Sequence, residues 1–150
     1  MDGFIGRDRE LAMLGRYFAR VGAGDRPGRA VLMRGRRRVG KSRLAEEFIR
    51  RSGVPSLFFT AAHEPLADQL ARFIADAAAS NLPDASLFDG VAPTSWDSAL
   101  RLLAQAVPQD SPSIVVLDEL PFMIAQDPHL EGRCSVSSTA NSHAARCCSY

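Results

Sequence analysis

The chain has 150 residues and a net charge of +1, with 46% hydrophobic and 23% charged residues, which suits one globular domain with its own core. Its balanced charge favours neither a nucleic-acid nor a membrane partner. No apolar stretch approaches the roughly 20 residues needed to span a bilayer, and the start, Met1 to Phe4, lacks a charged-then-apolar signal sequence. A cytoplasmic location without membrane contact is therefore expected.

The first third of the chain predicts a helix, a strand and a second helix. The first helix has apolar residues at helical spacing and Asp8 as its candidate N-cap. A glycine-rich turn over residues 22–28 leads into a short apolar run over 30–33, which is typical of a buried parallel strand. The second helix begins near Lys41. The apolar positions of the two helices are Leu11, Leu14, Phe18 and Val21, then Leu44, Ala45, Phe48 and Ile49.

Between that strand and helix lies a glycine-rich loop with the only lysine of the chain, Lys41; the other 17 basic residues are arginines. The loop matches the phosphate-binding pattern G-x-x-x-x-G-K-[ST], which this composition would produce by chance in roughly one of 2,000 such chains. Its residues are Gly35, Arg36, Arg37, Arg38, Val39, Gly40, Lys41 and Ser42.

The residue types of this loop suit a nucleoside triphosphate. Gly35 and Gly40 permit close backbone approach, so that loop amides can form an anion nest at the start of a helix. Lys41 would contact the β- and γ-phosphates, and Ser42 would hold Mg²⁺. Two readings of the arginines at 36–38 stay open: a solvated or partner-facing role, and additional phosphate contacts.

The middle of the chain predicts a second strand over residues 55–60 and two amphipathic helices separated by a loop over 81–93. The second of these helices has Thr94 or Ser95 as its N-cap, and Trp96 is interpreted as a core anchor. His63 follows the second strand, where it either approaches the ligand or has no role. The inner faces of the helices are Leu66, Leu70, Phe73, Ile74 and Ala77, then Trp96, Ala99, Leu100, Leu103 and Val107.

A third buried strand over residues 113–117 ends in two acids, Asp118 and Glu119. Acids at the carboxyl end of such a strand face the crevice where open α/β sheets bind ligands. Asp118 would hold Mg²⁺ through its water shell, and Glu119 would orient and deprotonate an attacking water; the alternative is two solvated acids. Because Lys41 is the only lysine, the Asn/Thr-Lys-x-Asp segment that reads guanine is absent from the chain.

The last part of the chain, residues 133–150, shows no helix or strand period and contains all three cysteines. We expect a partial domain over residues 1–132 followed by a disordered or frameshifted tail over 133–150. A zinc site is disfavoured because its candidates lack a proper C-x₂₋₄-C pair. Those candidates are Cys134, His143, Cys147 and Cys148.

Three motifs in order resemble the archaeal-type P-loop ATPases of the AAA/STAND group: the phosphate loop, the strand ending in Asp118 and Glu119, and an F-x-G-R-x-x-E-L opening that begins at Phe4. The resemblance runs from about Phe4 to Leu130. It implies that ATP is bound with its phosphates along residues 35–43, Arg43 included. It also implies that the adenine and ribose lie near Phe4, Ile5, Gly6 and Arg7.

The resemblance further implies a three-layer P-loop fold with a parallel sheet in the order 5-1-4-3-2. Only strands 1–3 are recognisable, so strands 4 and 5 and the helical lid are expected to be missing. Family members act as ATP-driven switches or motors. For this chain we expect Mg-ATP binding that is weak at best and hydrolysis impaired by the missing parts; the alternatives are a regulatory switch without turnover and a non-functional fragment. Self-association or a protein partner is open, and DNA contact would need regions outside this chain.

Overall fold

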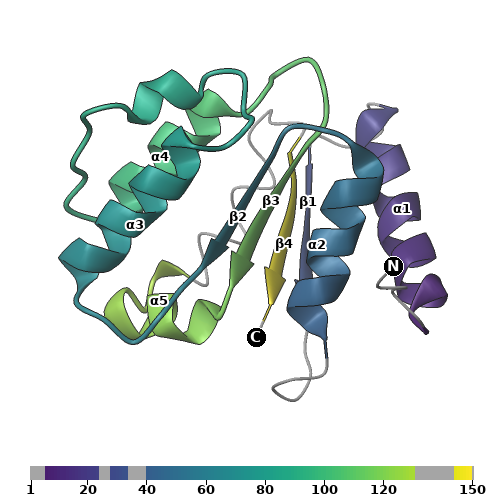
Figure 1. Ribbon diagram of the computed structural model, residues 1–150, viewed down its shortest axis with the longest axis horizontal. Helices are drawn as coiled ribbons and strands as arrows, with labels where there is room; N and C mark the ends of the chain where they lie inside the picture. The colour runs from purple at the N-terminus through teal and green to yellow at the C-terminus, as the bar shows by residue number, and fades with distance from the viewer. Residues whose placement is uncertain (1–5, 24–27, 34–39, 131–143, 150) are drawn as a thin grey trace.

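The computed structural model describes residues 6–23, 28–33, 40–130 and 144–149, which form a mixed α/β structure (Figure 1). None of the helices in these ranges is long and apolar enough to cross a membrane. The elements in chain order are α1 (Asp8–Gly22), β1 (Gly28–Met33), α2 (Lys41–Ser52), β2 (Ser56–Thr60), α3 (Leu66–Ala78), the 3-10 helix η1 (Ala85–Phe88), α4 (Trp96–Ala106), β3 (Ser113–Asp118), α5 (Leu120–Gln126) and β4 (Ala144–Ser149).

The strands form one sheet in the order β1-β4-β3-β2, and every neighbouring pair is parallel. The expectation of an α/β fold with a parallel sheet is therefore confirmed. Because parallel strands end at a common edge, the carboxyl ends of β2, β3 and β4 lie together at the lower edge of the sheet in Figure 1, where α2 and α5 also begin.

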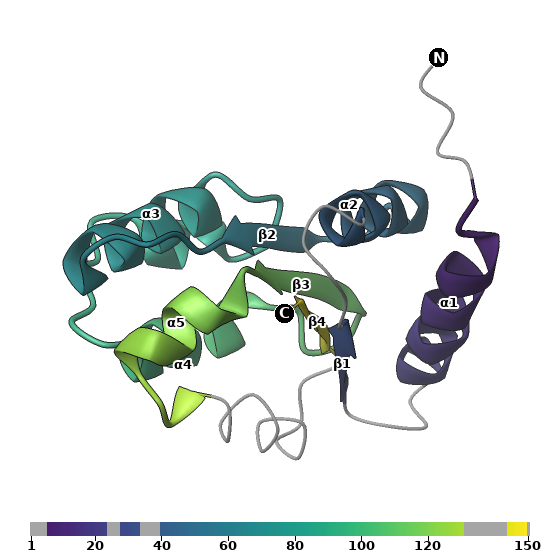
Figure 2. The same cartoon turned by 90° about the horizontal axis from the view of Figure 1, so that it is seen from below.

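The central strand β3 divides the core into two layers. All six of its residues are buried, and alternate side chains point to opposite faces because a strand has a period of two. Ile114 and Val116 pack with Ala45 of α2 on one face. Val115 and Leu117 pack on the other face with residues of α3, α4 and α5. Helices thus cover both faces of the sheet (Figures 1 and 2).

An aromatic cluster fills the layer beneath α3 and α4. Trp96 is 1% exposed, and its ring centroid lies 5.7 Å from that of Phe59 and 5.4 Å from that of Phe73. Phe59 and Phe73 meet edge to face at 5.3 Å, within the range that favours aromatic pairs. The interpretation of Trp96 as a core anchor is confirmed.

The structure confirms one of the predicted N-caps of α4 and contradicts the predicted N-cap of α1. At α4 the Ser95 hydroxyl accepts a hydrogen bond from the Ser98 amide at 3.2 Å, so Ser95 is the N-cap and Thr94 is not. At α1 the N-cap position is Arg7, whose carbonyl accepts from the Leu11 amide at 3.0 Å. Asp8 is already the first helical residue, so its prediction as a cap is wrong. Its negative charge instead interacts favourably with the positive end of the helix dipole.

The far end of α2 carries an ion-pair cluster. Hydrogen bonds from Arg50, and then from Arg51, hold the pKa of Glu47 at about 2, below its ordinary value of 4.5. The two arginines lie in the last turn, where positive charge complements the negative end of the helix dipole. Arg50 and Arg51 therefore lie at the end of α2 opposite Lys41.

The fourth strand overturns one prediction. Residues 144–149 form β4, which pairs with both β1 and β3, so the expectation that the sheet stops after three strands is wrong. The segment Ala-Ala-Arg-Cys-Cys-Ser has no β-branched or aromatic residue, and therefore gave no strand signal. Hydrogen bonding to a neighbour on each side makes it a strand. Residues 131–143 lie outside the described ranges, so their expected disorder stays a prediction.

Candidate functional site

The start of α2 forms one half of the candidate site. Gly40 is its N-cap with a left-handed backbone (φ 79°, ψ 26°), and Lys41 is the first helical residue. The Gly40 carbonyl accepts from the Leu44 amide at 3.0 Å, which closes the first turn. The remaining amides of that turn are the groups that a helix start offers to an anion, and the side chains of Lys41 and Ser42 are half-buried beside them.

The end of β3 forms the other half. Asp118 is the last residue of β3 and only 6% exposed, and the half-buried Glu119 follows it directly. Asp118 pairs in register with Thr60 at the end of β2. A buried carboxylate is costly unless hydrogen-bonded or paired, so this position requires partners.

One hydrogen bond joins the two halves. The Ser42 hydroxyl donates to Oδ2 of Asp118 at 2.5 Å, across 76 residues of sequence. Oδ1 of the same carboxylate accepts from the Glu119 amide at 2.9 Å. A hydroxyl has one proton and two lone pairs, so with its proton directed at Asp118 the Ser42 oxygen keeps its lone pairs for a cation. The structure therefore brings together Ser42 and Asp118, which the sequence predicted as metal-binding residues.

Glu119 has a left-handed backbone (φ 55°, ψ 40°) and is the N-cap of α5. It is the only non-glycine residue with positive φ in the described ranges. For an L-residue this conformation costs about 1–2 kcal/mol, and such strain is concentrated at functional sites. The chain turns from β3 into α5 through this one residue, which sets where the Glu119 carboxylate leaves the backbone.

The structure describes three of the other predicted site residues: Gly6, Arg7 and Arg43. Gly6 is exposed with φ 97°, and Arg7 is half-buried at the start of α1. Arg43 is exposed on α2. The predicted adenine contacts and loop contacts outside the described residues are Phe4, Ile5, Gly35, Arg36, Arg37, Arg38 and Val39.

His63 lies in the loop between β2 and α3, on the same edge of the sheet as Asp118. Its side chain is exposed, and its ring packs edge to face against Phe122 of α5, with centroids 6.1 Å apart. Phe122 lies in the first turn of α5, where its amide donates to the Glu119 carbonyl at 3.0 Å. His63 is therefore close to the candidate site in the fold.

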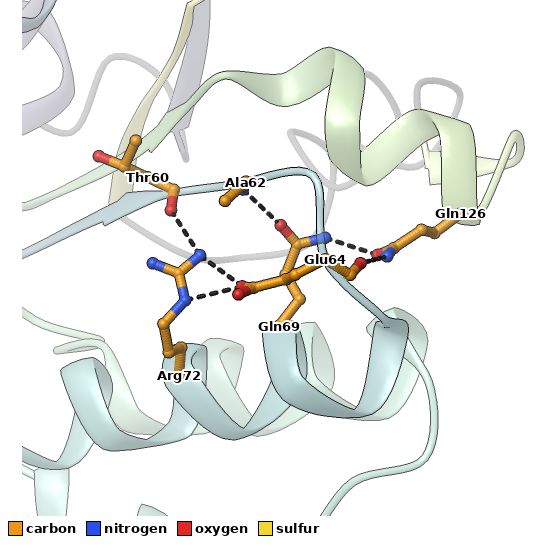
Figure 3. A network of polar contacts seen from close by, with 6 residues as sticks. All are labelled: Thr60, Ala62, Glu64, Gln69, Arg72 and Gln126. Atoms are coloured by element: carbon orange, nitrogen blue, oxygen red, sulfur yellow. Dashed lines mark hydrogen bonds and ion pairs between the residues drawn. The ribbon is translucent and has the colours of Figure 1, made fainter.

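Two glutamines near this edge were missed by sequence reasoning. Gln69 of α3 is fully buried and hydrogen-bonds to Gln126 of α5 at 2.6 Å (Figure 3). A signal did exist, because Gln69 lies at helical spacing between Leu66 and Phe73 on the apolar face of α3. An amide on such a face needs buried partners, but the sequence does not say which residue supplies them.

Replacing Gly40 by alanine is expected to destabilise the fold by about 1 kcal/mol, because its φ of 79° favours glycine. A Cβ at Gly40 would meet nothing within 4 Å among the described residues, so the cost is conformational. Gly15→Ala is the matched control: it lies within α1, also with nothing within 4 Å, and should stabilise by up to about 1 kcal/mol. Urea unfolding measures both, and shifts of the same sign would contradict this account.

No protein-family model matches this chain, and no curated protein matches its sequence.

Proposed function

We propose that the protein binds Mg-ATP at the edge formed by the start of α2 and the end of β3. The observation that carries this proposal is the hydrogen bond from Ser42 to Asp118. It joins a helix start that suits phosphate to a carboxylate that suits a hydrated divalent cation. The helix start alone, or the carboxylate alone, would not support the proposal, since each also occurs as an ordinary structural feature.

Each residue has a role that follows from its chemistry. The first-turn amides of α2 would bind phosphate oxygens, and the Lys41 ammonium would neutralise charge on the β- and γ-phosphates. The Ser42 hydroxyl oxygen would bind Mg²⁺ directly, and Asp118 would bind its water shell. The ion neutralises charge on the triphosphate when bound.

Hydrolysis is the reaction we assign to this site, with Glu119 as general base. The Glu119 carboxylate would take a proton from the water whose oxygen bonds to the γ-phosphorus, while the bond from that phosphorus to the bridging oxygen of ADP breaks. Its position directly after Asp118, on a backbone turn of fixed geometry, supports this role.

The fold supports an ATPase of the P-loop type in two further respects. The observed order β1-β4-β3-β2 agrees with four of the five strands in the order 5-1-4-3-2 that the resemblance implies. The expectation of weak binding depended on a missing strand between β1 and β3, and β4 occupies that position. The choice of ATP over GTP depends on the resemblance and on the single lysine.

Equilibrium binding of a fluorescent ATP analogue, with and without Mg²⁺, tests the proposal. Lys41→Ala is expected to raise the Kd at least about tenfold, because a charge-assisted hydrogen bond contributes about 1.5–3 kcal/mol. The control is Arg16→Ala, which removes one exposed positive charge from α1 and should leave the Kd unchanged. An amine-reactive ATP analogue should label Lys41, and excess Mg-ATP should prevent the labelling.

Four other outcomes would contradict parts of this assignment. Equal Kd values for Lys41→Ala and the parent would rule out the site. Tighter binding of GTP than of ATP would overturn the base preference. Mg-ATP binding without release of phosphate would favour a nucleotide-dependent switch, and the absence of both binding and a cooperative thermal transition would favour a non-functional fragment.

A further inference from the structure

Three hydrogen bonds, together with the backbone between Ala62 and Glu64, form a ring that joins the loop after β2 to α5 (Figure 3). The Ala62 amide donates to Oε1 of Gln69 at 2.8 Å, and Nε2 of Gln69 donates to Oε1 of Gln126 at 2.6 Å. Nε2 of Gln126 then donates to the Glu64 carbonyl at 2.6 Å. The ring thus begins and ends in the same loop, after passing through α3 and α5.

The Ala62 amide and the Glu64 carbonyl fix the orientation of the side-chain amides of Gln69 and Gln126. The Ala62 amide can only donate, so it requires the oxygen of Gln69, and the Glu64 carbonyl can only accept, so it requires the nitrogen of Gln126. Flipping either side chain would break the ring. The amides therefore specify one arrangement of the loop and α5, since these part-buried hydrogen bonds all form in only one orientation of the two side chains.

The loop between β2 and α3 is also bound to β3 and to α3. The Ala61 amide donates to the carbonyl of Asp118 at 2.9 Å. On the α3 side, Arg72 donates to the Glu64 carboxylate at 2.7 Å and to the Thr60 carbonyl at 3.2 Å. The loop therefore connects the end of β3 with the end of α5.

Glu119 lies between these two attachment points. Asp118, on its N-terminal side, is bound to the loop through its carbonyl, and Gln126, at the last position of α5, is bound through its side chain. The second attachment adds to the core packing of Leu120 and Met123 and further limits how far α5 can shift about the single-residue turn at Glu119. A carboxylate that must abstract a proton from water depends on position to within about 1 Å.

We propose that Gln69 and Gln126 are positioning residues, whose amide bridge between the β2–α3 loop and α5 fixes Glu119 beside Asp118 and Ser42. This inference rests on the proposed function for its catalytic consequence, but the fixing of Glu119 is a property of the nucleotide-free protein. The bridge acts at a distance, since neither glutamine belongs to the candidate site itself.

Gln126→Glu is the sharpest variant. It keeps the shape of the side chain and the oxygen that accepts from Gln69, but removes the donor to the Glu64 carbonyl, and its half-buried position tolerates a carboxylate. Gln126→Leu removes both bonds. Arg72→Leu is the control, because it releases the same loop from α3 and leaves the bridge to α5 intact.

Amide hydrogen exchange of the nucleotide-free protein, followed residue by residue by NMR, decides the matter. Both Gln126 variants should speed exchange at the Ala62 and Glu119 amides at least about tenfold, the factor expected for loss of one hydrogen bond. Neither amide contacts Gln126 directly. Arg72→Leu should leave exchange at Glu119 unchanged. Unchanged exchange at Glu119 in both Gln126 variants, or an equal rise in the control, would overturn the inference.

Steady-state hydrolysis gives the catalytic readout. Both Gln126 variants should lower kcat for ATP about 10- to 100-fold with an unchanged Kd for Mg-ATP, whereas a merely structural role would lower stability and binding together. A parent protein that neither binds nor hydrolyses ATP would refute the proposed function, while faster exchange at Glu119 in the variants would still establish the bridge.

Discussion

A variant that ends at residue 143 is expected to lose its cooperative fold and, with it, the affinity for Mg-ATP that the proposed function requires. β4 pairs with β1 on one side and β3 on the other, so its removal deprives β1 of the only neighbour it has in the described sheet. β4 is paired over six residues with β1 and over five with β3. At about 1 kcal/mol net for each hydrogen bond, the loss is on the order of 10 kcal/mol, comparable with the whole stability of a small domain.

Circular dichroism in urea and equilibrium binding measure the two effects. The matched control ends at Ser149 and keeps all of β4, so it should unfold at the parent urea concentration. A variant ending at 143 that unfolds at the same urea concentration as this control would show that β1 and β3 need no strand between them. Retained Mg-ATP affinity in an otherwise unfolded variant would show that α2 and its loop act without β3.

If the proposed hydrolysis takes place, replacing Glu119 by glycine or by alanine is expected to lower activity equally, while the two variants differ in stability. Glu119→Gly and Glu119→Ala both remove the carboxylate, so each should lower phosphate release by about 10²- to 10⁴-fold. Glycine adopts the left-handed backbone of this position (φ 55°) without strain. Glu119→Gly should therefore be more stable than Glu119→Ala by about 1 kcal/mol.

The comparison of glycine with alanine isolates the backbone, because neither variant keeps the side-chain contacts of Glu119. A third variant, Glu119→Gln, tests the carboxylate itself. It preserves the shape of the side chain and should bind Mg-ATP without hydrolysing it. Equal urea midpoints for the glycine and alanine variants would show that position 119 is unstrained. Full activity in Glu119→Gln would exclude Glu119 as the base and favour a switch that works by conformation.

The strands show why the sequence predicts some elements and not others. The largely apolar runs at 30–33, 55–60 and 113–117 correspond to β1, β2 and β3, because such runs are the usual sequence signal of strands in a parallel sheet. β4 has small and polar residues and depends on its two neighbours. Its position is a property of the whole sheet, which local patterns do not contain.

The candidate site divides in the same way. The sequence predicted Ser42 and Asp118 as residues of one site, and the fold brings them into contact. The left-handed backbone of Glu119 could not be predicted, because the usual signal for that conformation is a glycine. The bridge between Gln69 and Gln126 could not be predicted either, since the two residues are 57 positions apart and no spacing rule connects them.

The parallel pairing of β4 also has a consequence for the order of folding. Gly28 pairs with Ala144, and Ser113 with the same residue, so the central ladder joins segments that are synthesised far apart in time. Until β4 inserts, β1 and β3 each expose a strand edge, and contacts of such high sequence separation form slowly. We therefore expect the nascent chain to be most prone to aggregation between the formation of β3 and the insertion of β4.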